Sequence, residues 1–119
     1  MTVFVLQSFA HQRRSPGRGA DQKAFGAHIG IASLPLIWYG TEEQKQRYLP
    51  KLATCEWIGA YALSESTSGS DAMRIRTRAV LSNDEAFYIR NGEKQVITNG
   101  GIAGLYTIFA KIIEPNGRE

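Results

Sequence analysis

The chain has 119 residues, enough for one small domain with a modest hydrophobic core. Apolar residues make up 43% of it and charged residues 21%, so a disordered or fibrous chain is excluded. The net charge of +3 traces to Arg13, Arg14 and Arg18, because residues 21–119 carry eleven basic and eleven acidic side chains. A generally basic surface for binding nucleic acid is therefore excluded.

Two further classes are excluded by residue usage. No apolar run approaches the roughly 20 residues that a membrane-spanning helix needs. Cys55 is the single cysteine, so an internal disulfide is impossible and the chain fits a reducing compartment. We expect a cytoplasmic location, with the mitochondrial matrix as the alternative. We expect no metal, because no second histidine or cysteine stands at ligand spacing from His28, and a buried histidine with satisfied hydrogen bonds is the preferred interpretation of that residue.

Residues 1–20 are predicted to be a disordered segment that is unrelated to the rest of the chain. Their arginine-rich, acid-free composition is also typical of a mitochondrial transit peptide. We favour an unrelated beginning, since such a composition arises easily by chance in twenty residues. A secretory signal is excluded, because the charges follow the apolar residues instead of preceding them.

The first predicted helix begins after Asp21, which is a good N-cap residue. Pro35 is expected to kink or restart this helix, and Gly40 to end it. Its apolar face is predicted from residues that recur at helical spacing, namely Phe25, Ile29, Ala32 and Leu36.

A second helix is predicted to begin at Thr41, where Thr41 and Gln44 form a capping box. Glu42 and Glu43 suit the positive end of that helix. Pro50 is expected to end it or to begin another turn.

From Trp57 onward the pattern changes to strands. Residues 57–63 and 105–111 are predicted strands, and residues 73–79 alternate as a half-buried strand with Arg74, Arg76 and Arg78 on its polar face. A two-stranded hairpin is predicted over residues 86–98, because Asn91-Gly92 suits a tight type I′ turn. Helices followed by antiparallel strands indicate an α+β fold.

One loop carries the chemistry. After the apolar start of the segment Tyr61–Asp71, five hydroxyl side chains fall within seven residues around Gly69. Loop N–H groups and hydroxyls can converge on an anion, so this loop could hold a phosphate-bearing cofactor. A plain surface loop is the alternative, and it is the commoner interpretation of such a composition.

Four stretches together resemble the acyl-CoA dehydrogenase family in order and spacing. They are GTEEQKQRYLPKLA (40–53), GAYALSESTSGSDA (59–72), RTRAV (76–80) and NGEKQVITNGG (91–101). The resemblance implies an unmatched segment at 1–20, the end of a helical N-terminal domain at 21–55, and the first half of an incomplete antiparallel β-barrel at 56–119. It thus implies a fragment of a longer enzyme, with an acyl-CoA substrate and FAD as cofactor.

The resemblance also implies the cofactor site. The cofactor-binding residues would be Tyr61, Ala62, Leu63, Ser64, Gly69, Ser70, Val96, Ile97 and Thr98, and Ser70 would also contact acyl-CoA. Thr98 is implied to reach the N5 and O4 edge of the flavin. Two positions depart from the family, which commonly has tryptophan at Val96 and often proline at Ser66.

The implied reaction is α,β-dehydrogenation of an acyl-CoA thioester in fatty acid β-oxidation, with electrons passed to an electron-transferring flavoprotein. The resemblance places the catalytic base beyond Glu119, so no acid of this chain is assigned that role and the chain alone is expected to be inactive. It also implies a homo-oligomer for the full-length protein. The alternatives are a non-catalytic module that binds flavin or CoA, and a relative such as an acyl-CoA oxidase.

Overall fold

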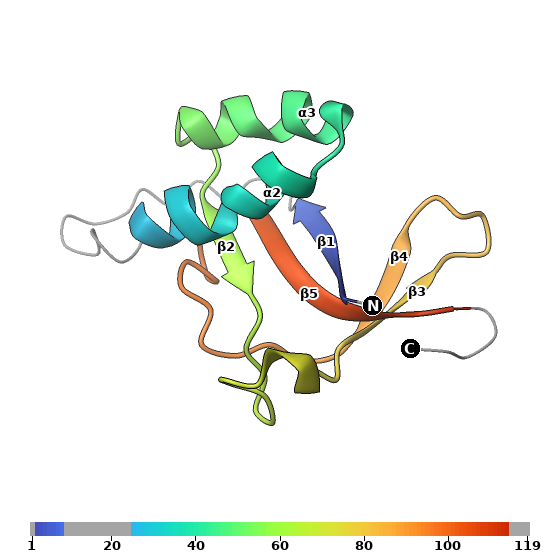
Figure 1. Ribbon diagram of the computed structural model, residues 1–119. Coiled ribbons are helices and arrows are strands. Elements are labelled where there is room, and N and C mark those ends of the chain that lie inside the picture. The colour runs from blue at the N-terminus through green and yellow to red at the C-terminus, as the bar shows by residue number, and fades with distance from the viewer. Residues whose placement is uncertain (1, 9–24, 115–119) are drawn as a thin grey trace. The chain divides into compact units, whose positions relative to one another are not determined.

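The computed structural model describes residues 2–8 and 25–114, which fall into two compact units. The first unit consists of Met1–Val5, Ala62–Val96 and Ile108–Glu119, and the second of Leu6–Tyr61 and Ile97–Thr107. The helices η1 (Ala27–Ala32), α2 (Leu34–Tyr39) and α3 (Glu42–Ala53) belong to the second unit, and Figure 1 labels α2 and α3. Residues 2–8, which we expected to be disordered, form strand β1 (Thr2–Ser8), and residues 9–20 lie outside the described part.

The first predicted helix is confirmed from Phe25 onward, whereas Asp21 lies outside the described residues. It consists of a π-helix, η1 (Ala27–Ala32), and an α-helix, α2 (Leu34–Tyr39), which restarts with Pro35 in its first turn and ends at Gly40. The predicted apolar face is only half right. Ala32 and Leu36 are buried, but Phe25 and Ile29 are 59% and 52% exposed. The wider π turn changes which residues face the core, and His28 is buried instead.

The capping box of the next helix is confirmed. In α3 (Glu42–Ala53) the Thr41 hydroxyl accepts from the Gln44 N–H at 3.2 Å, and the Gln44 side chain accepts from the Thr41 N–H at 3.0 Å. The helix continues past Pro50 for one more turn. Leu36, Leu52 and Leu105 form the buried core of the second unit, with Tyr48, Leu49 and Trp57 packed against it.

The strands form a five-stranded mixed sheet in the order β1-β5-β3-β4, with β2 (Gly59–Ala62) also paired to β5 (Leu105–Ile113). Strand β3 (Arg78–Leu81) is antiparallel to β4 (Tyr88–Asn91) but parallel to β5. The predicted α+β class is confirmed, while the expectation of a purely antiparallel arrangement is wrong for the β3–β5 pair. The strands predicted at 57–63 and 105–111 are present as β2 and β5.

The strand predicted over residues 73–79 begins only at Arg78. Ala72–Arg74 form a short 3-10 helix, η2, which the Asp71 side chain caps by accepting from the Met73 N–H at 3.2 Å. The predicted burial pattern nevertheless holds from Ile75 to Ala79, where buried and exposed residues alternate. The alternation predicted burial correctly, but strand pairing did not follow from it.

The hairpin predicted around Asn91-Gly92 is wrong. Strand β4 pairs backward with β3, so the turn of the hairpin lies at residues 82–87, and no strand follows Gly92 up to residue 98. Asp84 stabilises that turn by accepting from the Ser82 hydroxyl at 2.6 Å and from the Ala86 N–H at 3.2 Å. Gly92 has φ of +152°, and a Cβ there would lie 2.7 Å from the Thr77 Cα. This glycine therefore serves a close backbone approach and not a tight turn.

Among the helices that the structure describes, none has both the length and the apolar character needed to cross a membrane.

Candidate functional site

The loop after β2, which the sequence suggested as a site for a phosphate-bearing cofactor, is a tight loop in the first unit. The backbone of Glu65 both donates to and accepts from Ser68, with N–O distances of 2.9 and 3.2 Å. The Ser68 hydroxyl donates to the Asp71 carbonyl at 2.6 Å, which fastens the loop to the start of η2. Ser68 is thus a structural hydroxyl, buried within the loop. The hydroxyls of Ser66, Thr67 and Ser70 belong to exposed residues.

The loop is built on the buried carboxylate of Glu65, which is 5% exposed. One oxygen, Oε2, accepts from the Arg76 N–H at 2.6 Å. The other, Oε1, accepts from both the N–H and the hydroxyl of Thr77, at 3.0 and 2.6 Å. Lys94 Nζ lies 2.7 Å from the same oxygen. Four donors therefore satisfy this buried charge, as a buried carboxylate requires.

The pKa of Glu65 reflects this environment. Burial raises it, but the hydrogen bonds from Lys94, Thr77 and the backbone of Arg76 and Thr77 outweigh burial and lower the pKa from 4.5 to about 2. Glu65 is therefore a structural anion at neutral pH.

Lys94 and Gln95 join this loop to the second predicted segment. Lys94 Nζ donates to the Leu63 carbonyl at 3.0 Å as well as to Glu65. The Gln95 N–H donates to the Ser64 carbonyl at 3.0 Å, and its side-chain amide donates to the Glu65 carbonyl at 3.1 Å. Two segments that lie about thirty residues apart in sequence are thus held side by side within the first unit.

Lys94 is the residue that sequence reasoning missed. It stands in the NGEK stretch, where a lysine next to polar residues looks like an ordinary surface charge. Its side chain is only 8% exposed. The one signal in the sequence was Glu65, an acid in a loop of small polar residues. The structure shows that this carboxylate is buried and that Lys94 is its cationic partner.

The other predicted site residues of the first unit differ in exposure. Ala62 is buried at the end of β2, and Leu63 and Ser64 are partly buried. Gly69 and Ser70 are exposed, and a Cβ at Gly69 would meet no atom within 4 Å. Val96 is 87% exposed and has φ of +55°, a left-handed conformation that is unusual for a β-branched residue.

The predicted site residues of the second unit are Tyr61, Ile97 and Thr98. Tyr61 and Ile97 are partly buried, and Thr98 is exposed in a turn in which the Gly100 N–H donates to the Ile97 carbonyl at 3.0 Å. Asn99 has φ of +67°, and its side chain donates to the Gly59 carbonyl at 3.1 Å, which anchors this turn to β2.

His28 is a buried histidine with both ring nitrogens engaged, as the sequence predicted. Its Nδ1 accepts from the Gly59 N–H and its Nε2 lies 2.9 Å from the Leu52 carbonyl, which assigns the proton to Nε2. The ring therefore ties η1 to α3 and β2, and its role is structural. The residues that the structure describes contain no group of three or more potential metal ligands.

The comparisons with known proteins agree with this architecture. Residues 12–56 match the acyl-CoA dehydrogenase N-terminal domain, and residues 60–119 match the acyl-CoA dehydrogenase middle domain. A probable acyl-CoA dehydrogenase of Bacillus subtilis is 49% identical over 94 residues, which cover 79% of this chain and 16% of that protein. The human mitochondrial very long-chain specific acyl-CoA dehydrogenase is 49% identical over 86 residues, covering 72% of this chain and 13% of the relative.

A solved structure shares the fold. The crystal structure of an acyl-CoA dehydrogenase complexed with FAD from Bacillus anthracis is 51% identical and superimposes with a TM-score of 0.73, covering 76% of this chain and 15% of that one. The matched domains and these similarities show that the chain belongs to the acyl-CoA dehydrogenase family. It spans less than a fifth of the length of these three relatives.

Several of the predicted site residues, each taken by itself, have side-chain chemistry that suits a flavin. In the part of the chain that the structure describes, the hydroxyls of Ser64, Ser70 and Thr98 take part in no hydrogen bond, so they are available as donors. Val96 offers an uncovered apolar surface, and Gly69 leaves open space beside the loop backbone. Hydroxyl donors and an apolar surface suit the polar edge and the flat face of an isoalloxazine ring.

Proposed function

We propose that this chain provides the flavin-facing loops of an FAD-dependent acyl-CoA dehydrogenase. The reaction is oxidation of an acyl-CoA thioester to the trans-2-enoyl-CoA, with the electrons passed on to an electron-transferring flavoprotein. The observation that carries the proposal is the junction in the first unit, where Lys94 and Gln95 hold the second segment against Leu63, Ser64 and Glu65. This junction fixes Ser64 and Val96 on one framework, as a rigid cofactor site requires.

The roles of individual residues follow from their chemistry and from the family resemblance. Bound FAD would supply the hydride acceptor. The hydroxyls of Ser64 and Thr98 would donate to the polar edge of the ring, where donors stabilise the charge that develops during reduction. Gly69 and Ser70 would lie at the cofactor phosphates, with Ser70 also at the acyl-CoA. The remaining cofactor-binding residues in this proposal are Tyr61, Ala62, Leu63, Val96 and Ile97.

The base that removes the α proton is proposed to lie beyond Glu119. The support within this chain comes from Glu65, which directly follows the proposed flavin residue Ser64. Four donors occupy its carboxylate and its pKa is lowered to about 2, so it is a poor proton acceptor near neutral pH. In this proposal residues 21–55 end a helical N-terminal domain and residues 56–119 begin the middle β domain. The complete enzyme would be a homo-oligomer of the cytoplasm or the mitochondrial matrix.

Two experiments test the proposal. The first is titration of the chain with FAD, followed by flavin fluorescence, using Ser64→Ala and Thr98→Val, with Ser66→Ala, an exposed hydroxyl of the same loop, as the control. Each site variant should weaken binding several-fold, since each removes a hydrogen bond worth about 0.5–1.5 kcal/mol. Equal binding by all three variants would contradict the assigned contacts.

The second experiment measures flavin bleaching without oxygen after addition of a saturated acyl-CoA. We expect residues 1–119 to bleach FAD no faster than free FAD is bleached, because the base in this proposal lies outside these residues and proton removal needs a base within about 3 Å of the α proton. Faster bleaching that Glu65→Gln abolishes would identify Glu65 as the base and overturn the assignment. FAD binding without bleaching also fits a non-catalytic flavin-binding module. A longer version of the chain that reduces FAD but passes electrons only to oxygen would indicate an acyl-CoA oxidase.

A further inference from the structure

The dipeptide Asn-Gly occurs twice in the described part of the chain, in different surroundings. Asn91-Gly92 lies at the end of β4 in the first unit, and Asn99-Gly100 lies in the turn of the second unit that follows Thr98. Asparagine is among the thermally labile residues of proteins. A glycine that follows it favours attack on the asparagine side chain, because the missing Cβ leaves the glycine nitrogen open to approach.

The second dipeptide, Asn99-Gly100, is held at both of its reacting groups. The side-chain amide of Asn99 donates to the Gly59 carbonyl at 3.1 Å. The Gly100 N–H donates to the Ile97 carbonyl at 3.0 Å. Both residues of the dipeptide are partly buried. The nitrogen that would attack and the amide that it would attack are thus both engaged, and the turn has to open before they can react.

The first dipeptide, Asn91-Gly92, has no such restraint. Both residues are exposed, and within the described residues neither the Asn91 side chain nor the Gly92 N–H takes part in a hydrogen bond. Asn91 is the last paired residue of β4, opposite Arg78, so its bond to Gly92 lies beyond the paired residues. Among the described strands, β4 has β3 as its single partner (Figure 1). The end of such an edge strand opens locally, and rotation there can bring the Gly92 nitrogen to the Asn91 side chain.

The fold requires the glycine of this dipeptide. Gly92 has φ of +152°, and a Cβ at this position would lie 2.7 Å from the Thr77 Cα. A larger residue, which would shield the backbone nitrogen from Asn91, therefore does not fit at position 92. The reactive dipeptide is thus a consequence of the close approach of two backbone segments.

We propose that Asn91 is a site of spontaneous deamidation through a cyclic imide. The Gly92 nitrogen bonds to the Asn91 Cγ, the bond from Cγ to the side-chain nitrogen breaks, and ammonia leaves with the proton of the Gly92 N–H. Water then opens the imide at either of its carbonyls. Opening at Cγ gives aspartate, and opening at the main-chain carbonyl gives isoaspartate, in which the main chain runs through the side-chain carbons. The chain and water are the reactants, and no oxidant or reductant is needed.

Either product alters the end of β4. Aspartate places a carboxylate at the position paired with Arg78. Isoaspartate adds a carbon to the main chain between the pairing with Arg78 and the close approach of Gly92 to Thr77. These two contacts lie at adjacent residues, so a longer main chain cannot keep both in their present positions. Isoaspartate at position 91 should therefore weaken the pairing of β3 with β4. The inference does not depend on the proposed flavin site.

The test is incubation of the folded chain at neutral pH, followed by digestion with trypsin and mass spectrometry. Cleavage after lysine and arginine separates the three Asn-Gly dipeptides of the sequence into the peptides 91–94, 95–111 and 112–118. The last of them lies outside the described residues and is not compared. Asn91 should lose its amide about tenfold faster than Asn99, because two hydrogen bonds must open at Asn99. In urea the two rates should become similar.

Asn91→Gln is the control variant. It keeps an exposed amide, but its longer side chain closes an imide ring much less readily, so no acid should accumulate at position 91. The urea midpoint of the unmodified chain should fall as isoaspartate accumulates, and that of Asn91→Gln should fall less. Synthetic peptides distinguish isoaspartate from aspartate.

Three results would overturn the proposal. The first is that Asn91 reacts as slowly as Asn99 in the folded chain. The second is that the preference for Asn91 persists unchanged in urea, which would assign it to the neighbouring sequence and not to the fold. The third is that aspartate forms without isoaspartate, because direct hydrolysis of the amide by water gives aspartate alone.

Discussion

Lys94 and Glu65 form a buried ion pair at 2.7 Å, with their side chains 8% and 5% exposed. The pair joins two loops that are separated by about thirty residues of sequence, and Leu63, Arg76 and Thr77 complete its hydrogen bonds. A buried ion pair is not automatically stabilising, because both charges lose their hydration. Breaking it by removing one partner is costly, however, since the other charge stays buried and unpaired.

We therefore predict that Glu65→Gln and Lys94→Gln each lower the free energy of unfolding by about 3–5 kcal/mol. The double variant should lose less than the sum, because the two amides can hydrogen-bond to each other. Urea unfolding followed by circular dichroism measures all three variants. The control is Glu42→Gln, which removes an exposed pair with Lys45 at 3.0 Å and should cost under about 1 kcal/mol. Additive losses would show that the two side chains are not coupled.

The lowered pKa of Glu65 predicts a specific dependence of stability on pH. The folded-state pKa is about 2 and the ordinary value is 4.5, so the folded state binds this proton more weakly than the unfolded state. The stabilisation is complete above pH 4.5 and is lost as the pH falls toward 2. Urea midpoints measured between pH 6 and pH 2.5 should fall for the unmodified chain. Over the same range the midpoints of Glu65→Gln should fall distinctly less, and parallel curves would contradict this role of Glu65.

Replacing glycine by alanine should change the stability of the chain in opposite directions at Gly92 and at Gly30. Gly92→Ala should lower the free energy of unfolding by roughly 2 kcal/mol or more, because φ is +152° and the new Cβ would lie 2.7 Å from the Thr77 Cα. Gly30→Ala should raise it by about 0.5–1 kcal/mol, since Gly30 is helical and a Cβ there meets no atom within 4 Å. The midpoints of thermal unfolding of the two variants are compared with that of the unmodified chain. A Gly92→Ala midpoint equal to that of the unmodified chain would exclude the close approach of Gly92 to Thr77.

The local signals in the sequence were reliable where the determining contacts are local. The capping box of Thr41, the restart at Pro35 and the stop at Gly40 each depend on neighbouring residues, and each is present. The hairpin at Asn91-Gly92 was wrong because β4 pairs with β3, the strand before it, and Gly92 lies against Thr77, where there is no room for a side chain. The alternation of apolar and polar residues between Ile75 and Ala79 likewise predicted which side chains are buried, but it did not predict where strand pairing begins.

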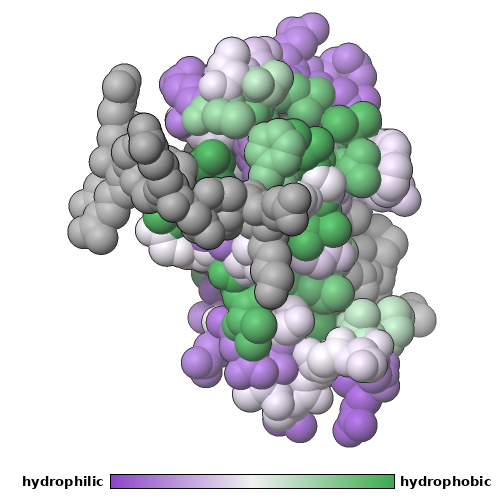
Figure 2. All heavy atoms as spheres, turned by 90° about the vertical axis from the view of Figure 1, so that its left-hand side faces the viewer, coloured by the Kyte–Doolittle hydropathy of each residue, from purple (hydrophilic) through white to green (hydrophobic). Residues whose placement is uncertain are grey.

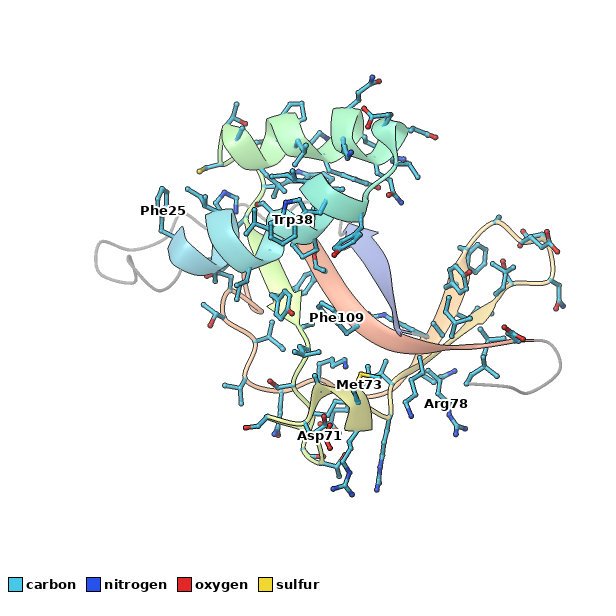
Figure 3. The ribbon with its side chains drawn as sticks, viewed as in Figure 1. Phe25, Trp38, Asp71, Met73, Arg78 and Phe109 are labelled. Atoms are coloured by element: carbon cyan, nitrogen blue, oxygen red, sulfur yellow. The ribbon has the colours of Figure 1, made fainter. Side chains whose placement is uncertain are left out.

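Exposure of large apolar residues could not be predicted from periodicity. Phe25, Ile29 and Trp38 are 59%, 52% and 64% exposed, and Figure 3 shows Phe25 and Trp38 as side chains of the helical segment. Figure 2 shows hydrophobic patches on the surface between polar ones. The π-helix changes which side chains reach the core, and nothing in the spacing indicates a π-helix. In the candidate site, the Lys94–Glu65 ion pair could not be predicted from the sequence, because the two residues lie about thirty positions apart and only folding brings them together.

The backbone of Val96 predicts a gain in stability. A β-branched residue with φ of +55° is strained by about 1–3 kcal/mol, whereas glycine adopts this conformation freely. Val96 is 87% exposed, so its side chain contributes little packing. We expect Val96→Gly to raise the urea midpoint of the FAD-free chain by an amount that corresponds to about 1 kcal/mol. A lower midpoint would show that the left-handed conformation is not kept in solution.

The same position predicts a change in cofactor affinity. The family resemblance implies tryptophan at the position of Val96, and an aromatic ring stacked on the flavin adds about 0.5–1.5 kcal/mol beyond simple burial. Val96→Trp should therefore bind FAD roughly 2- to 12-fold more tightly than the unmodified chain, as measured by flavin fluorescence. Ile89→Trp is the matched control, because Ile89 is an exposed apolar residue of β4 in the same unit and an added tryptophan there tests for unspecific stacking. Equal gains from both variants, or no gain from Val96→Trp, would contradict a flavin at Val96.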